Sequence, residues 1–169
     1  MNETLENKPS AVSGNLEDDA MGIVRKHVYA AMGFGLLPIP GFDIVAMTGT
    51  QLNLVRMLSN LYGVGFKKEA VKGIIGSLVG GFTPVAFAAP VASLLKLIPV
   101  VGQTAGGLSL SLTGGASTYA LGKVFIQHFA SGGTMLTFDP AAMKNYYTEK
   151  YCEGIKVASE MKEAKAKGA

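Results

Sequence analysis

Two long apolar stretches near the start of the chain have helical spacing and are separated by a proline-rich turn. The first covers residues 20–37, and Pro38 and Pro40 must end it, because proline lacks the amide donor that a helix needs. The second covers residues 43–62, and Gly63 can end it by adopting a left-handed conformation. The pattern predicts two antiparallel helices joined as a hairpin.

Two uncharged runs follow, over residues 73–95 and 97–122. Each exceeds the roughly 20 apolar residues that a membrane-spanning helix requires. Pro84 interrupts the first run, which favours two short helices there, whereas the second can continue as one helix to about residue 129. Hydropathy alone leaves open whether these runs span a bilayer, re-enter it, or are buried in a helical core.

The C-terminal segment has a different character. Asp139 and Pro140 predict a capped helix start. Apolar residues then recur every fourth position among alternating charges, which is typical of an amphipathic helix that packs on the core or docks on another protein. The sequence predicts an all-α fold of five or six helices in two hairpin-like halves: a flexible acidic tail over 1–19, an apolar helical domain over 20–131, and a charged amphipathic helix over 139–167.

Small residues recur at four-residue intervals in both uncharged runs. Such spacing leaves one face of a helix almost bare and lets two backbones approach closely. The predicted packing positions are Gly76, Gly80, Gly102, Gly106, Gly114 and Gly122.

The turns themselves are unusually apolar. An Ile-Pro pair occurs at residues 39–40 and again at 98–99, each ahead of a long predicted helix. If both turns lie at one end of the bundle, they form an apolar patch suited to a bilayer or to a partner protein. Asp43 is the only acid near the first turn; we expect it to cap the following helix, and the alternative is a buried acid that responds to protons.

Composition strengthens the membrane interpretation. The chain is 49% hydrophobic and 16% charged, whereas an average domain has about 25% charged residues. Residues 21–138 contain eight bases and two acids. These bases lack the dense clustering and interleaved aromatic residues of a nucleic-acid groove, so the excess favours an anionic membrane surface and no nucleic acid.

Catalytic chemistry finds little support in the sequence. Between Asp19 and Asp139 only Asp43 and Glu69 are acidic, and no phosphate-binding loop or nucleophile motif occurs. The two histidines are isolated from one another and from other metal-binding residues, and Cys152 is the single cysteine. Of the two histidines, His27 is expected on a helix surface. We therefore expect no enzyme activity, no metal and no cofactor.

The turns and their following helices resemble a known family. The segments PIPGFD at 38–43, IPVVG at 98–102 and YALG at 119–122 are similar to the YcjF-like bacterial domain of unknown function, over roughly residues 22–131. The resemblance implies membrane proteins, often fused to or encoded beside Era-like small GTPases, and it implies no catalytic residue. The matching positions are Pro38, Pro40, Gly41, Asp43, Gln51, Tyr62, Gly63, Pro99, Gly102, Tyr119 and Gly122.

These observations predict a non-enzymatic, membrane-associated scaffold or accessory protein at the bacterial inner membrane or its cytoplasmic face. The resemblance implies a small GTPase as partner, and the glycine spacing suggests a homo-oligomer. Two alternatives stay open. One is a membrane-embedded oligomeric pore or transport component, and the other is a soluble helical domain that binds lipid or another apolar ligand.

Overall fold

The fold is known from a computed structural model, which describes residues 10–34, 42–80 and 105–168. Within these residues the chain forms helices and no strand, which confirms the all-α prediction. The helices are α1 (Ser10–Phe34), α2 (Phe42–Leu61), α3 (Lys68–Gly80), α5 (Ala105–Ala130) and α6 (Pro140–Lys167).

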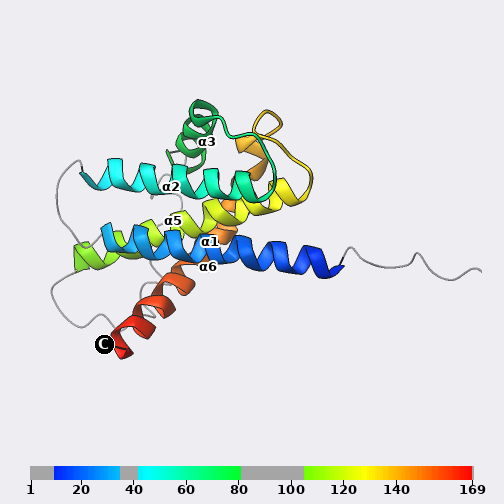
Figure 1. The fold of residues 1–169 in the computed structure, drawn as a ribbon. Coiled ribbons are helices and arrows are strands. Elements are labelled where there is room, and N and C mark those ends of the chain that lie inside the picture. Colours follow the sequence, from blue (N-terminus) through cyan, green and yellow to red (C-terminus); the bar gives the residue numbers. More distant parts are fainter. Residues whose placement is uncertain (1–9, 35–41, 81–104, 169) are drawn as a thin grey trace, which may run out of the picture.

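Three of the helices lie side by side in Figure 1. Helix α1 runs antiparallel to both α2 and α5, and α6 crosses them steeply. Helices α1 and α2 form the predicted first hairpin. The second predicted hairpin depends on residues 81–104, which lie outside the described residues.

Helix α5 is the centre of the fold. From Ser111 to Ile126 nearly every residue is buried, and only Thr113 and Lys123 are half-buried. A helix that is apolar and small-sided all round must be surrounded by other helices, and α5 packs against α1, α2 and α6. Its neighbours each contribute an apolar stripe at helical spacing, which includes Val24, Val28, Leu54, Leu58, Tyr147, Tyr151 and Ile155.

Glycines set the distance between these helices. A Cβ added to Gly122 of α5 would stand 2.5 Å from the side chain of Val24 in α1. A Cβ on Gly154 of α6 would lie 2.9 Å from the backbone oxygen of Ala116 in α5. Real Cβ atoms do not approach other atoms so closely. Both helix contacts therefore require glycine at these positions.

Two helices end in the same glycine-based cap. Gly63 after α2 has φ 65°, and Gly132 after α5 has φ 79°. At α2 the amides of Gly63 and Val64 donate to the carbonyls of Asn60 and Ser59, at 3.2 and 2.8 Å. These two bonds define a Schellman motif, so the prediction that Gly63 ends the second helix is confirmed.

The N-terminal boundary differs from the prediction. Helix α1 begins at Ser10, about ten residues before the expected start at Ala20, so residues 10–19 are helical rather than a flexible tail. Asp18 and Asp19 lie inside the helix and are exposed, so they do not cap it. Charged side chains that stay in water do not end a helix, and no proline interrupts the segment.

The C-terminal boundary agrees with the prediction. Asp139 caps α6, accepting hydrogen bonds from the amides of Ala141 at 2.9 Å and Ala142 at 3.3 Å, and Pro140 occupies the first turn. Tyr147 and Tyr151 face α5 and are buried. The amphipathic helix therefore folds back onto the core.

The contact between α6 and α5 yields a stability prediction. Gly154→Ala should lower the free energy of unfolding by about 1–3 kcal/mol, because the new methyl group meets fixed backbone atoms of Ala116. Gly73→Ala is the matched control, since a Cβ there meets nothing within 4 Å and alanine favours a helix by about 1 kcal/mol. Urea or guanidinium unfolding measures both. Equal midpoints for the two variants would contradict the close contact.

Candidate functional site

One end of the bundle gathers the helix termini that flank both apolar turns. The C-terminus of α1 and the N-termini of α2 and α5 lie together, on the left in Figure 1. The segment with Ile39-Pro40 joins α1 to α2 here, and the residues that follow Ile98-Pro99 lead into α5 at the same end. We call it the turn end.

Several predicted site residues at this end lie outside the described residues. They are Pro38, Pro40, Gly41, Pro99 and Gly102. Asp43 is the second residue of α2 and Gly106 the second of α5, but their side-chain surroundings also lie outside what the structure describes. The capping and proton-responsive roles of Asp43 both stay hypotheses.

The side chains just behind the turn end are exposed and mixed in character. Tyr29 of α1 and Val45 of α2 have exposed fractions of 47% and 72%, which is high for large apolar residues. Arg25 and Lys26 follow one turn farther along α1 and are also exposed. This part of the surface thus combines apolar contact area with positive charge.

A shallow groove between α1 and α2 opens next to these residues. His27 lies at its base and is buried, so its expected place on the helix surface was wrong. Its Nδ1 donates to the carbonyl of Ile23 at 2.8 Å, and its Nε2 accepts from the amide of Asn53 at 3.0 Å. The histidine bridges the two helices. The lining residues are Lys26, His27, Ala30, Ala46, Gly49, Thr50 and Asn53.

A buried polar chain links three helices through one of the family-matching positions. The amide of Gln51 in α2 donates to the hydroxyl of Ser117 in α5 at 3.2 Å. The same hydroxyl is 2.9 Å from the phenol oxygen of Tyr147 in α6. Burial raises the pKa of Tyr147, so this phenol stays protonated and the chain serves alignment rather than proton transfer.

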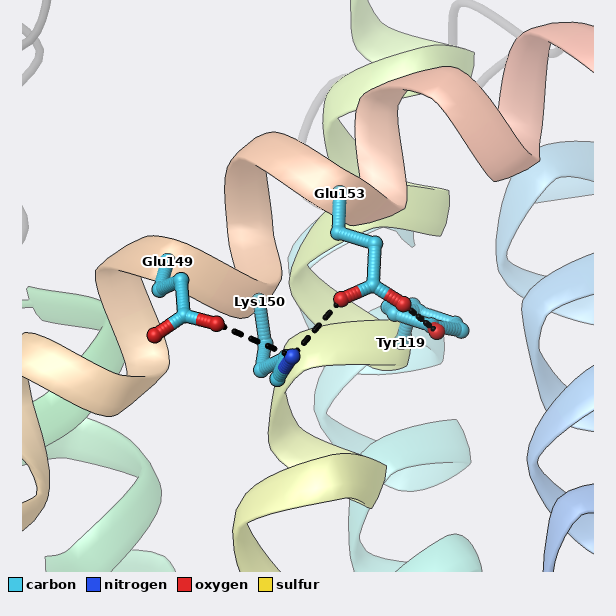
Figure 2. Close-up of polar contacts among 4 residues, drawn as sticks. All are labelled: Tyr119, Glu149, Lys150 and Glu153. Carbon is cyan, nitrogen blue, oxygen red and sulfur yellow. Dashed lines mark hydrogen bonds and ion pairs between the residues drawn. The ribbon is translucent and has the colours of Figure 1, made fainter.

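A second polar cluster holds α6 on α5 (Figure 2). The phenol of Tyr119 donates to Glu153 at 2.5 Å, and the ammonium of Lys150 lies 2.8 Å from the other carboxylate oxygen. Lys150 also pairs with Glu149 at 3.0 Å. Hydrogen bonds from Lys150 and Tyr119 lower the pKa of Glu153, and burial together with the bond to Glu153 raises the pKa of Tyr119. The charges are paired, which identifies an ion-pair lock rather than a reactive centre.

The end opposite the turn end is closed by aromatic rings. The ring of Tyr62, at the end of α2, lies 5.9 Å from that of Phe129 in α5. Phe125 stacks on Phe138 at 4.9 Å, and His128 meets Phe138 edge-on at 4.8 Å. The Nε2 of His128 donates to the carbonyl of Thr134 at 2.9 Å. Tyr62 and Gly63 therefore tie the helix ends together here.

Comparison with known proteins places this fold in a family. Residues 2–149 match a domain of unknown function, DUF697. The chain belongs to the DUF697 family. The YcjF-like resemblance is thereby confirmed, because DUF697 is the family associated with YcjF-like proteins. No solved structure matches the chain.

One similar curated protein is magnetosome membrane protein 22 of Magnetospirillum gryphiswaldense, strain MSR-1. The two are 36% identical over 158 residues, which cover 93% of this chain and 80% of the relative. Neither the family description nor the name of the relative gives a sign of catalysis. Among the described residues of the DUF697 domain, no three His, Cys, Asp or Glu side chains gather as a metal site.

The structure separates the predicted packing glycines of this DUF697 domain into two groups. Gly114 and Gly122 of α5 lie against Met47 of α2 and Val24 of α1. Gly76 and Gly80 of α3 are exposed, and a Cβ on either meets nothing within 4 Å in the described part of the chain. Packing through the α3 pair stays a prediction that concerns other molecules.

Some structural residues had no signal in the sequence. Gly154 falls in a charged, amphipathic segment without a four-residue glycine pattern, although α5 and α6 depend on it. Ser117 and Glu153 are ordinary polar residues, and the partners that they bind across helices, Tyr147 and Tyr119, are 30 and 34 positions away in the chain. Only the three-dimensional crossing of α6 over α5 reveals these contacts.

The buried polar chain predicts a large effect for a small substitution. Ser117→Ala should lower the free energy of unfolding by about 1–3 kcal/mol, because it leaves the buried amide of Gln51 without its acceptor. Thr148→Ala should change it by less than about 0.5 kcal/mol, since that hydroxyl bonds only its own helix at Lys144. Denaturant titrations measure the free energy of unfolding of both variants. A loss for Ser117→Ala as small as that for Thr148→Ala would contradict the hydrogen bonds that link Gln51, Ser117 and Tyr147.

The ion-pair lock predicts a pH-dependent contribution to stability. The folded state lowers the pKa of Glu153 from its ordinary 4.5, so the carboxylate stabilises the fold above that value and loses its effect as pH falls through the folded pKa. Glu153→Gln should cost about 0.5–1 kcal/mol at neutral pH, because the group is 42% exposed, and nothing in strong acid. Thermal unfolding from pH 7 to pH 3 tests this, with exposed Glu163→Gln as control. A cost that persists unchanged at pH 3 would argue against the lock.

Proposed function

We propose that this protein is a membrane-associated, non-enzymatic scaffold or accessory protein that works at a bacterial inner membrane. The observation that carries the proposal is the 36% identity, over 93% of the chain, to a protein named for its place in a membrane. A likeness that extends over so much of both chains supports a shared location.

The arrangement of the helices supports a specific contact. The Ile-Pro pairs at residues 39–40 and 98–99 precede α2 and α5 in the sequence, both helices begin at the turn end, and exposed Tyr29 and Val45 add apolar surface there. Residues of this kind gain free energy when they leave water for a bilayer interface. Within the described residues, no helix has the length and hydropathy to cross a bilayer. The contact that we propose is made by the turn end.

The YcjF-like resemblance extends the proposal to a partner. We infer that a separate small GTPase, encoded near this chain, is the protein that the scaffold recruits. Vesicles that carry this protein should retain such a GTPase, and equal retention on bare vesicles would reject the pairing. A homo-oligomer at the membrane belongs to the same proposal, with exposed Gly76 and Gly80 as its candidate contact.

Flotation with vesicles tests the membrane contact. The full chain should float with vesicles, and Ile39→Lys should weaken this roughly 100-fold, because placing a lysine at membrane depth costs about 2.5–3.5 kcal/mol. Leu136→Lys is the matched control: Leu136 is 76% exposed and lies beyond α5, at the opposite end. Equal flotation of both variants would exclude the turn end as the contact, and a wild-type chain that never floats would exclude membrane association.

A further inference from the structure

Exposed side chains change character in a fixed order along α1. Measured back from Phe34 at 1.5 Å per residue, Tyr29 stands about 8 Å from the turn end, and Lys26 and Arg25 stand about 12–14 Å from it. Asp19 and Asp18 come at about 22–24 Å. All five side chains are exposed. The helix thus passes from aromatic to cationic to anionic residues with increasing distance from the turns.

Helix α2 begins with the acid Asp43 and then passes from apolar Val45 to a distant base. Val45 is about 5 Å along the helix from Phe42, whereas its next charged residue, Arg56, is about 21 Å away. Asp43 is the acidic residue nearest the turn end, and the two positive charges of Arg25 and Lys26 exceed its single negative charge. Residues that cross the interface of a bilayer follow a common order from the hydrocarbon core outward. Apolar side chains come first, aromatic rings follow, and basic side chains lie at the headgroups.

The bases of α1 are available to a ligand. Arg25 and Lys26 form no ion pair with any other described side chain; the described ion pairs lie in α3 and α6. The groove beside Lys26, of about 470 Å³, is lined by no acidic residue. Positive charge that no described side chain neutralises is complementary to the phosphates of anionic lipids.

From this order we propose that the α1–α2 hairpin meets an anionic bilayer end-on, with Tyr29 and Val45 in the interfacial layer and Arg25 and Lys26 against lipid phosphates. The inference rests on the membrane association proposed above and adds the orientation and the lipid class. In this orientation the acidic residues Asp18 and Asp19 of α1 lie far from the anionic surface. A hairpin lying flat would instead bring Arg56 and the exposed Met57 to the surface as well.

Single tryptophans can report the orientation, because the chain has none of its own. Tyr29→Trp should show a blue-shifted emission and quenching by brominated lipid when vesicles of phosphatidylglycerol and phosphatidylcholine are added. Met57→Trp, about 22 Å along α2 from its start, should show neither change. Equal shifts at both positions would overturn the end-on orientation.

Matched charge variants test the lipid phosphates. Arg25→Gln/Lys26→Gln should weaken binding to the anionic vesicles roughly 25-fold, at about fivefold per base near the surface. Arg56→Gln/Lys67→Gln removes the same charge toward the opposite end, on either side of the cap at Gly63, and should change binding less than twofold. All four bases are exposed, so both variants should keep the wild-type helical circular dichroism.

The outcomes distinguish the two proposals. Full binding by Arg25→Gln/Lys26→Gln, or equal wild-type binding to purely zwitterionic vesicles, would overturn the phosphate contact while membrane association stands. Equal losses in the two double variants would mean that net charge, rather than position, governs binding, and would overturn the inference. A wild-type chain that binds no vesicle would reject the proposed function itself.

Discussion

The close approach of α5 to its neighbours is the constraint on which the other contacts of the fold depend. Glycine at positions 115, 122 and 154 lets α1 and α6 come near enough to enclose α5. Once α5 is enclosed, its hydroxyl groups must find partners inside the protein, because water cannot reach them. The bonds from Ser111 to the carbonyl of Met32 and from Ser117 to Tyr147 satisfy this requirement and also set the rotation of α5 between its neighbours.

The two ends of the bundle have opposite designs. One contains the glycine caps that end α2 and α5 and the clustered rings of Tyr62, Phe125, Phe129 and Phe138. The other carries exposed apolar and basic side chains on α1 and α2. A rigid far end lets a small area at the turn end hold a defined orientation, since the helices behind it cannot splay apart.

Much of the fold followed from local patterns. Helix ends at Gly63 and Asp139 were predictable because caps are properties of a few adjacent residues. The start of α1 was not, because exposed charges are equally compatible with a tail and with a helix. His27 and Gly154 were beyond reach for another reason: their burial depends on Asn53 in α2 and on Ala116 in α5, which no local window contains. The apolar Ile-Pro pairs were visible in the sequence, whereas the common end at which α2 and α5 begin required the packing of the helices.

The position of α6 in the chain has a consequence for biosynthesis. Helix α5 is enclosed only when α6, which follows it and has 28 residues, has been made. At 5–20 residues per second this leaves roughly 1–6 s during which the buried side of α5 has no cover. An exposed helix of this composition is prone to aggregate or to adsorb to lipid. The order of the helices therefore makes the completion of α6 the step that covers α5 and ends this interval.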